Sequence, residues 1–199
     1  MRQTQFDIIR HGEPVGGRRY RGGGIDDPLS EAGWRQMWAA IGNEGDWDQI
    51  ISSPMQRCLA FARALAGRHA LPLAADPGFV EIGMGAWEGR AHAEVAAREP
   101  EAFAAFYRDP VGHRPPGAEP LNAFSARIAT AFDRQMAAYP GRRLLIVCHA
   151  GVTRALIGHV LGAKPSAWYR MRIDYAGLSR VRDDGFGPGV EFVNRRRLR

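Results

Sequence analysis

Short apolar runs that end at serine, histidine or glycine predict buried β-strands along this chain. Residues 5–9 are rich in aromatic and β-branched side chains, and residues 48–52 form a similar run. Residues 143–148 are the most strand-like stretch of the chain, and residues 71–75 give a further short strand. Additional strands are expected toward the C-terminus, at residues 169–173, 178–182 and 190–194.

Apolar residues at helical spacing follow these runs and predict helices. Ser30 is suited to be an N-cap, and Trp34, Met37, Trp38 and Ile41 then share one face of a helix. We interpret the two tryptophans as core residues.

Two further helices are predicted directly after strands. One follows Ser53, with Pro54 in its first position and Arg57 in its first turn. The other covers residues 152–161, after the conspicuous His149. Both junctions resemble the strand-to-helix turns at which open α/β sheets build their sites.

The middle third of the chain is mainly helical. Residues 91–107 have a helical pattern that is interrupted at Pro100, residues 109–120 form a proline-rich connection, and residues 121–139 form an amphipathic helix. We expect the segment of residues 91–139 to form a helical cap over the edge of the sheet.

Composition adds the general class of protein. A length of 199 residues suits one domain with a sizeable core, and 45% apolar with 24% charged residues is ordinary for a globular protein. No apolar run reaches the ~18 residues of a membrane span, and the start of the chain lacks a signal-peptide pattern. Cys58 and Cys148 do not form a metal-ligand pattern, so we expect a cytoplasmic protein without a structural metal.

The net charge of +6 does not by itself indicate a nucleic-acid partner. Four of the arginines lie in a basic tail over residues 195–199, and such tails are usually solvated. A second group of arginines surrounds the first two motifs, which favours a small anion as ligand. We therefore expect a small phosphorylated metabolite as partner and neither nucleic acid nor membrane, while the oligomeric state stays open.

Three strand ends carry residues that packing does not explain. Arg10 and His11 follow the first strand, Arg57 lies after the second, and His149 follows the strand at residues 143–148. Arginine binds phosphate oxygens in a bidentate manner, and a neutral imidazole is a competent nucleophile. The helix N-termini after Pro54 and His149 add backbone N–H groups for an anion. This combination favours phosphoryl transfer, and the chemistry requires no metal or cofactor.

The chain resembles the histidine phosphatase, or phosphoglycerate mutase-like, superfamily. The matching motifs run in order over nearly the whole chain, at residues 10–13 (RHGE), 26–37 (DDPLSEAGWRQM), 52–58 (SSPMQRC), 80–89 (VEIGMGAWEG), 115–120 (PPGAEP) and 148–154 (CHAGVTR). The resemblance implies an α/β fold, a three-layer α/β/α sandwich with a mostly parallel central sheet and a helical cap.

The resemblance also implies a division of roles. His11 would be the nucleophile that forms a phosphohistidine, and Arg10, Arg57 and a protonated His149 would hold the phosphoryl group. Glu81 would give a proton to the leaving alcohol and then activate water. From the residues alone Glu88 competes with Glu81 for this role, and we favour Glu81 because its neighbours are apolar.

Substrate-binding residues follow with less support from the motifs. Pro14 and Gly17 stand where the family often has polar residues, so Arg19 or Arg21 would replace their phosphate contacts. The remaining substrate-binding candidates are Ala150, at the start of the helix after His149, and Trp87 in the cap region. Phe106, Tyr107, His113 and Arg114 are cap residues that could bind substrate, pack in the interior or face solvent, whereas we interpret His69, His92 and His159 as structural or exposed.

Three functions remain open at this point. The leading hypothesis is a metal-independent phosphomonoesterase, and the chain is most similar to the α-ribazole phosphatases of cobalamin biosynthesis. A mutase that moves phosphoryl groups between hydroxyls is the first alternative. The second is a non-catalytic module that binds phospholigands or nucleic acid through its arginines.

Overall fold

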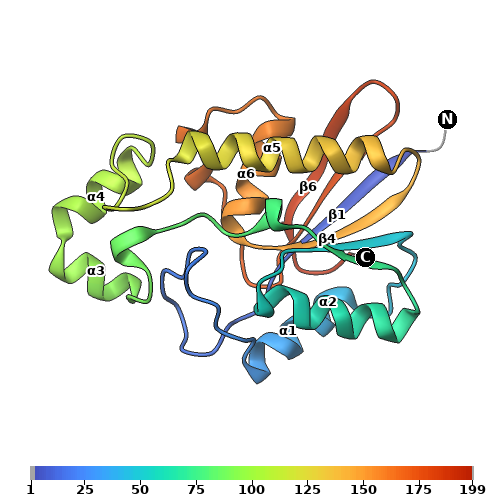
Figure 1. The fold of residues 1–199 in the computed structure, drawn as a ribbon, viewed down its shortest axis with the longest axis horizontal. Coiled ribbons are helices and arrows are strands. Elements are labelled where there is room, and N and C mark those ends of the chain that lie inside the picture. Colours follow the sequence, from blue (N-terminus) through green and yellow to red (C-terminus); the bar gives the residue numbers. More distant parts are fainter. Residues whose placement is uncertain (1–2, 199) are drawn as a thin grey trace.

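The computed structural model describes residues 3–198, which form a six-stranded mixed sheet (Figure 1). The strand order is β3-β2-β4-β1-β5-β6. The strands are β1 (Thr4–Arg10), β2 (Gln49–Ser52), β3 (Leu73–Ala75), β4 (Arg143–Cys148), β5 (Leu178–Asp183) and β6 (Pro188–Arg195). The first four of these in chain order run parallel, and β5 is antiparallel to both β1 and β6.

The register of the two central strands positions the site. β1 pairs with β4 so that Ile8 lies opposite Ile146 and Arg10 lies opposite Cys148. His11 and His149 are the next residues of the two strands, and the backbone N–H of His11 donates to the carbonyl of Cys148 at 2.9 Å. Two residues 138 positions apart therefore meet at the same carboxyl edge of the sheet.

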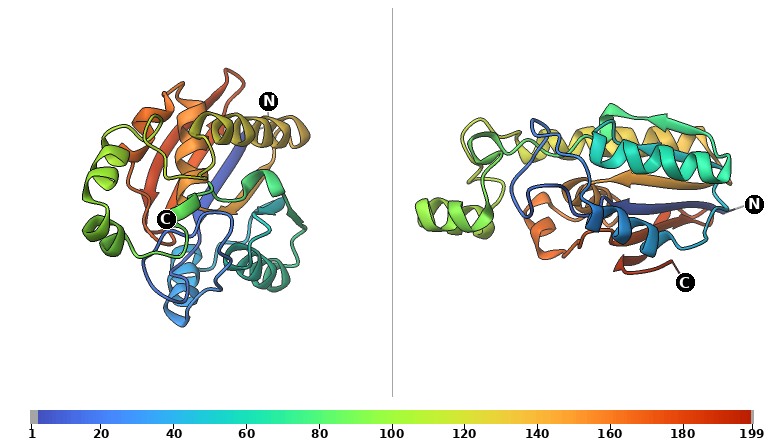
Figure 2. Two further views of the ribbon diagram at one scale, coloured as in Figure 1. Left: turned by 60° about the vertical axis from the view of Figure 1, so that its left-hand side comes forward. Right: turned by 90° about the horizontal axis from the view of Figure 1, so that it is seen from below.

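Helices cover both faces of this sheet, which confirms the predicted three-layer α/β/α sandwich (Figures 1 and 2). On one face α5 (Leu121–Ala138) and α6 (Ala150–Val160) pack against Phe6 and Ile8. On the other face α1 (Glu31–Ile41) and α2 (Gln56–His69) pack against Ile9. The alternation of side chains along β1 produces these two separate cores.

The segment of residues 91–139, expected as a helical cap, divides in the structure. α3 (His92–Arg98) and α4 (Pro100–Arg108) lie beyond the sheet, and the break between them is at Pro100 as predicted (Figure 2). α5 instead packs on the sheet, with Phe124, Ile128 and Phe132 in the core. Only the first two helices of the segment therefore stand over the edge of the sheet.

Two local predictions were wrong. Residues 169–173 are not a strand, because Pro165 begins the 3-10 helix η3 (Pro165–Arg170), which includes the first two of them, and residues 171–173 have no strand pairing. Pro54 precedes α2 and does not open it. The helix begins at Gln56, whose backbone N–H donates to the carboxylate of Asp26 at 2.9 Å.

A buried carboxylate joins the strands on the α1/α2 face. Asp7, in the middle of β1, has no exposed surface, and it accepts hydrogen bonds from Trp47 Nε1 (2.9 Å), Arg180 Nε (2.7 Å) and Arg143 Nη2 (3.1 Å). Arg143 belongs to β4 and Arg180 to β5, so this one side chain holds three neighbouring strands together. Such a charge is tolerated only because it is paired and fully hydrogen-bonded.

The other expected elements agree with the structure. Ser30 caps α1, since its Oγ accepts from the Gly33 N–H at 3.0 Å. In the C-terminal tail Arg195 lies over the ring of Phe192 at 4.2 Å and Arg199 lies outside the described residues. Among residues 3–198, none of the helices has both the length and the apolar character that crossing a bilayer requires.

Candidate active site

His11 is held rigidly at the end of β1 by the glycine that follows it. A Cβ on Gly12 would lie 2.2 Å from the carbonyl oxygen of Gly33, at the start of α1. Only glycine allows this approach, and Ser30 completes the contact by donating from its backbone and its hydroxyl to the carbonyl of Glu13. The loop after the nucleophile candidate is thus fixed against α1.

The hydrogen bonding of His11 defines its tautomer. Nδ1 lies 2.7 Å from the carbonyl oxygen of Gly12, which accepts only, so Nδ1 carries the proton and Nε2 keeps its lone pair. Burial, followed by the charges of Arg10 and Arg57, holds the pKa of His11 well below its ordinary value. The ring is therefore neutral near pH 7, as a nitrogen nucleophile requires.

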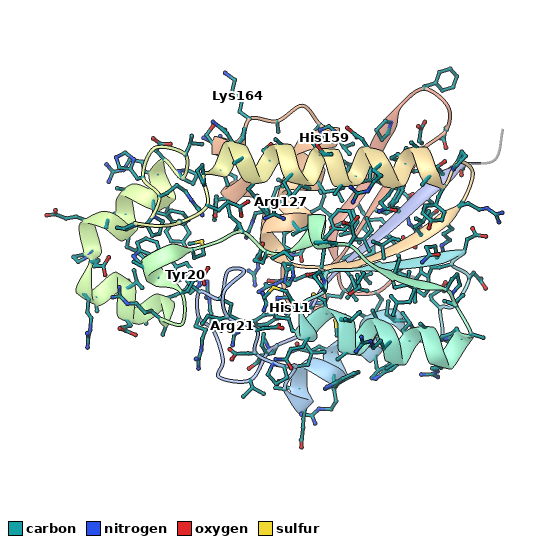
Figure 3. The ribbon with its side chains drawn as sticks, viewed as in Figure 1. His11, Tyr20, Arg21, Arg127, His159 and Lys164 are labelled. Carbon is teal, nitrogen blue, oxygen red and sulfur yellow. The ribbon has the colours of Figure 1, made fainter. Side chains whose placement is uncertain are left out.

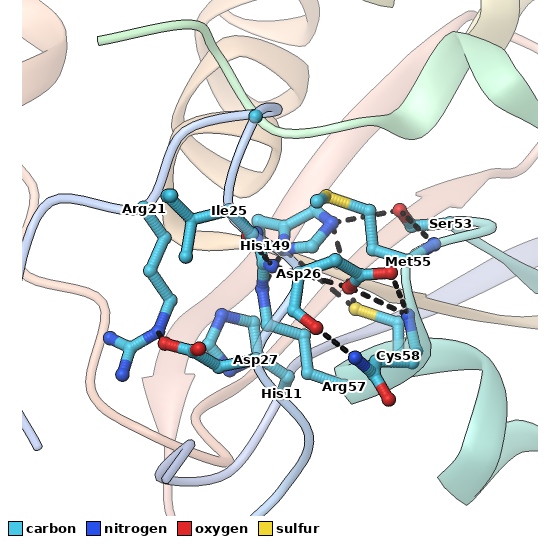
Figure 4. Close-up of polar contacts among 12 residues, drawn as sticks. His11, Arg21, Ile25, Asp26, Asp27, Ser53, Met55, Arg57, Cys58 and His149 are labelled. Carbon is cyan, nitrogen blue, oxygen red and sulfur yellow. Dashed lines mark hydrogen bonds and ion pairs between the residues drawn. The ribbon is translucent and has the colours of Figure 1, made fainter. Parts of the chain in front are cut away.

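His149 lies directly beside His11 and is completely buried. The two ring centroids are 5.2 Å apart. Nδ1 of His149 accepts from Arg57 Nε at 3.3 Å, so the proton is on Nε2, which donates to Ser53 Oγ at 2.8 Å (Figure 4). Burial and then Arg57 lower the pKa of His149 well below its usual value. His149 is therefore neutral near pH 7 in this arrangement, whereas the resemblance implies a protonated His149 during phosphoryl transfer.

Arg57 comes from the first turn of α2 and is 1% exposed. Besides its bond to His149, it donates from Nη1 to the carbonyl of Ile25 (2.8 Å) and from Nη2 to the carbonyl of Gly22 (3.0 Å). The carboxylate of Asp26 lies 3.6 Å from Nη1. Three separate contacts thus orient the guanidinium group before any ligand binds.

Arg10 supplies a second cation next to His11. Its Nη1 donates to the carbonyl of Ile173 at 2.7 Å, and its guanidinium carbon lies 4.1 Å from the ring centroid of Tyr175. Within the described residues Nε of Arg10 is buried without a hydrogen-bond partner. Burial lowers the pKa of Arg10 to about 10, so the side chain stays charged at neutral pH. A buried donor without a partner suits an anionic ligand.

Glu81 and Glu88, the two competing acids, lie in different surroundings. Glu81 faces the cavity, where its Oε2 accepts from the backbone N–H of Gly151, in the first turn of α6, at 3.1 Å, and its Oε1 accepts from Ile82 at 3.0 Å. Glu88 instead accepts from the backbone N–H groups of Met84 (2.8 Å) and Gly24 (3.1 Å). Glu88 therefore supports the glycine loop, and Glu81 is the carboxylate at the site.

A cavity of about 590 Å³ opens over these residues. Among the predicted substrate-binding residues, Arg19, Arg21 and Ala150 line it together with Arg10, His11, Arg57 and Glu81. His149 is fully buried and does not line the cavity, but it contacts Arg57, which does (Figure 4). Arg21 is anchored by Asp27 at 2.9 Å and by the carbonyl of Val15 at 2.7 Å, and Arg19 donates to the carbonyl of Gly16.

Trp87 does not line this cavity, contrary to the prediction. It is 1% exposed, and its indole N–H donates to Glu99 at 3.0 Å. Its ring packs between Tyr20 and Phe106 in the base of the cap. A large apolar side chain with its one polar atom satisfied is a packing residue.

Aromatic side chains form a further part of the cavity wall. Tyr20 stacks on His92 at 3.9 Å with an angle of 9° between the rings, and its hydroxyl lies 3.1 Å from that of Tyr107 in α4. Tyr169 completes this wall. His92, interpreted as structural or exposed, thus reaches the cavity, and burial lowers its pKa to about 4.

Three further arginines line the cavity: Arg18, Arg154 and Arg172. Arg18 belongs to the group of arginines around the first two motifs for which a small anion was expected, whereas Arg154 and Arg172 were not predicted as site residues. Arg172 is paired with Asp174 at 2.7 Å, and Arg154 donates to the carbonyl of Met171. The CHAGVTR motif contained Arg154, and the run of arginines at 18–21 contained Arg18, but no pattern in the sequence directed Arg172 to this cavity. Among residues 3–198 no group of three or more His, Cys, Asp or Glu side chains is placed to hold a metal ion.

The sequence matches a known family over almost its full length. A model of the histidine phosphatase superfamily (branch 1) matches residues 6–196. The bifunctional protein Rv2228c of Mycobacterium tuberculosis is 36% identical over 180 residues, which cover 88% of this chain and 49% of that protein. This chain thus spans about half the length of that relative. The probable phosphoglycerate mutase GpmB of Yersinia pestis is 30% identical over 182 residues, 89% of this chain and 84% of that protein.

Solved structures resemble this fold closely. The mycobacterial glucosyl-3-phosphoglycerate phosphatase Rv2419c in complex with VO3 aligns with a TM-score of 0.84 at 25% identity, over 98% of this chain and 99% of that one. The α-ribazole phosphatase of Shigella flexneri aligns with a TM-score of 0.82 at 25% identity, over 98% of each chain.

Proposed function

Because this chain belongs to the histidine phosphatase superfamily (branch 1), we propose that it is a metal-independent phosphomonoesterase that works through a phosphohistidine on His11. One observation carries the proposal. The Gly12 carbonyl fixes the proton of His11 on Nδ1, which leaves an unprotonated Nε2 on a ring that the charges of Arg10 and Arg57 act on. A neutral nucleophile among cations is what attack on a phosphate dianion requires.

The first half of the reaction forms the phosphohistidine. The lone pair on Nε2 of His11 attacks phosphorus, the P–N bond forms and the ester P–O bond breaks. Arg57 and the unpaired Nε–H of Arg10 stabilise the charge on the phosphoryl oxygens. The carbonyl of Gly12 accepts from Nδ1–H and so stabilises the positive charge that develops on the ring. The protonated carboxyl group of Glu81 donates its proton to the oxygen of the leaving alcohol.

The second half releases inorganic phosphate. The Glu81 carboxylate takes a proton from a water molecule whose oxygen attacks phosphorus, the P–N bond breaks, and its electron pair returns to Nε2 of His11. His149 keeps its proton on Nε2 and orients Arg57 through Nδ1. The backbone N–H of Ala150 lies at the positive end of the helix dipole of α6, which favours the phosphoryl group, whereas the N–H of Gly151 donates to Glu81.

The substrate is proposed to be a small phosphorylated metabolite. We propose α-ribazole 5′-phosphate, a precursor in cobalamin biosynthesis, because the α-ribazole phosphatase of Shigella flexneri shares 25% identity over 98% of both chains. The aromatic wall of Tyr20, His92, Tyr107 and Tyr169 suits a ring-bearing leaving group. We propose that the reaction takes place in the cytoplasm, since the two free thiols suit a reducing compartment.

A phosphatase assay in the presence of a chelator tests the proposal. Hydrolysis of p-nitrophenyl phosphate should persist in EDTA, and an alkaline denaturing quench should trap a phosphoryl-enzyme that is stable in base and is lost when the sample is acidified. His11→Ala should abolish both, whereas His159→Ala, which changes an exposed histidine on α6, should retain both. Turnover that continues without His11 would contradict the mechanism.

A substrate panel separates the finer alternatives. The panel contains α-ribazole 5′-phosphate, phosphoglycerates, sugar phosphates and nucleoside monophosphates, and the proposal expects the highest kcat/KM for the first of these. Isomerisation of a phosphoglycerate without net release of phosphate would favour a mutase, the activity in the printed name of GpmB. Salt-sensitive binding without any turnover would favour the non-catalytic module.

A further inference from the structure

The backbone that carries Glu81 is irregular and depends on side chains for its hydrogen bonds. Glu81 lies between the 3-10 helices η1 (Pro77–Phe79) and η2 (Gly85–Trp87), in a stretch without strand pairing. Buried carbonyl groups in such a stretch require partners from elsewhere. These partners determine where the carboxylate of Glu81 lies relative to the cavity.

Arg127 of α5 supplies the partners on the N-terminal side of Glu81. Its Nη1 donates to the carbonyls of Gly78 and Val80, both at 2.9 Å. Its Nε and Nη2 donate to the carboxylate of Glu119, at 2.9–3.1 Å. All three nitrogens of the guanidinium group therefore have partners within the protein. Arg127 does not line the cavity, so no donor of this side chain is directed at a substrate.

Glu119 supplies the partner on the C-terminal side. Its Oε2 accepts from the backbone N–H of Gly83 at 3.2 Å, and its own backbone N–H donates to the carbonyl of Gly83 at 3.1 Å. The ion pair between Arg127 and Glu119 thus contacts the chain at Val80 and at Gly83, on both sides of Glu81. Figure 3 shows Arg127 on α5, above the region of His11.

We infer that the Arg127–Glu119 ion pair is a positioning clamp for Glu81, which holds its carboxylate at the distance from the leaving oxygen that proton transfer requires. The inference rests on the proposed function, in which Glu81 is the proton donor. Arginine suits this task because its planar group contacts two carbonyls and one carboxylate at once, whereas lysine carries a single nitrogen. A displacement of about 1 Å at a proton donor can lower a rate by about a hundredfold.

Leaving-group dependence tests the clamp, because a phenol of low pKa departs without a proton and a phenol of high pKa does not. The experiment measures kcat/KM for aryl phosphates of similar size, from p-nitrophenyl to p-methoxyphenyl phosphate, and for glycerol phosphate. Arg127→Ala should lower kcat/KM for the poorest leaving groups by about tenfold to a hundredfold. The same variant should change kcat/KM for p-nitrophenyl phosphate by less than about threefold. Glu81→Gln should show the same steepened dependence.

The matched control is Arg134→Ala, which removes another arginine of α5 that pairs with Asp76 at 2.6 Å and does not contact residues 80–83. This variant should keep the wild-type dependence of kcat/KM on the pKa of the leaving group. Thermal unfolding and circular dichroism establish that each variant is folded. If Arg127→Ala does not fold, Arg127→Lys and Glu119→Gln replace it, since each retains the bulk and removes part of the clamp.

The possible results are distinct. In the first result, kcat/KM of Glu81→Gln depends steeply on the pKa of the leaving group, but the folded Arg127 and Glu119 variants lose kcat/KM equally for all leaving groups, or do not lose it. This result would overturn the clamp and leave the role of Glu81 intact. In the second result, the dependence of kcat/KM on leaving-group pKa in Glu81→Gln is no steeper than in the wild type. This result would overturn the role of Glu81 in the proposed mechanism, and the clamp with it.

Discussion

Replacement of Asp7 by asparagine is expected to destabilise the fold strongly without changing the chemistry of the cavity. Asp7 is fully buried and accepts from Trp47, Arg143 and Arg180. An asparagine keeps the shape but removes the negative charge, and it turns an N–H₂ group toward one of these donors. Breaking a buried ion pair by removing one partner costs about 3–5 kcal/mol. Because side chains of Arg143 and Arg180 are 23% and 16% exposed and regain some hydration, we expect the lower end, about 3 kcal/mol.

Urea unfolding at pH 7, followed by tryptophan fluorescence and by circular dichroism, measures this cost. A loss of about 3 kcal/mol is a large part of a typical stability of about 5–15 kcal/mol, and it should lower Tm by roughly 6–12 °C for a chain of this size. The control is Asp184→Asn, the same substitution in an exposed pair with Arg182, which should cost less than about 1 kcal/mol. If Asp7→Asn lost less than about 1 kcal/mol with an unchanged m-value, the argument that this carboxylate joins the strands would be refuted.

Three further predictions concern the site. Because the pKa values of His11 and His149 lie well below 6.5 in the folded chain, the unfolded chain binds more protons as the pH falls below 6.5. The free energy of unfolding should therefore decrease from pH 7 to pH 5, and urea unfolding should show a smaller decrease in His11→Gln and His149→Gln. Gly12→Ala should give poorly folded protein with a Tm many degrees lower, because its Cβ would lie 2.2 Å from the Gly33 carbonyl. A Tm within 2 °C of the wild type, roughly the effect of less than 1 kcal/mol, would contradict this contact. Arg57→Lys should lower kcat/KM by about a hundredfold, since lysine cannot keep three oriented contacts, and steady-state kinetics with near wild-type values would show that charge alone suffices.

The parts of the site that follow strands were predictable from the sequence. β1 and β4 are short apolar runs with sharp ends, so the residues after them, His11 and His149, had to lie at one edge of a parallel sheet. The motifs then directed attention to Arg57 and Glu81. What the structure adds is the hydrogen bonding: the tautomers of both histidines, and the supporting rather than chemical position of Glu88.

The parts that depend on long-range packing were not predictable. Trp87 was expected to bind substrate as a residue of the cap region, but its hydrogen-bond partner Glu99 is placed by the fold of α3 and α4. His92 and Tyr107 reach the cavity for the same reason. Pro54 was expected inside α2 because proline favours the first helical position, whereas the carboxylate of Asp26 sets the start of the helix.

Tyr20 has a consequence for how such a protein diversifies. Its ring stacks on His92 of α3 and its hydroxyl contacts that of Tyr107 of α4, so the loop beside the nucleophile and both cap helices share one residue. Mutations that reshape the cap for a new metabolite therefore also act on this loop. An engineered exchange of caps between relatives would have to transfer the partners of Tyr20 together with the helices. We therefore expect a change of specificity in this scaffold to need coordinated changes in two distant stretches of the gene.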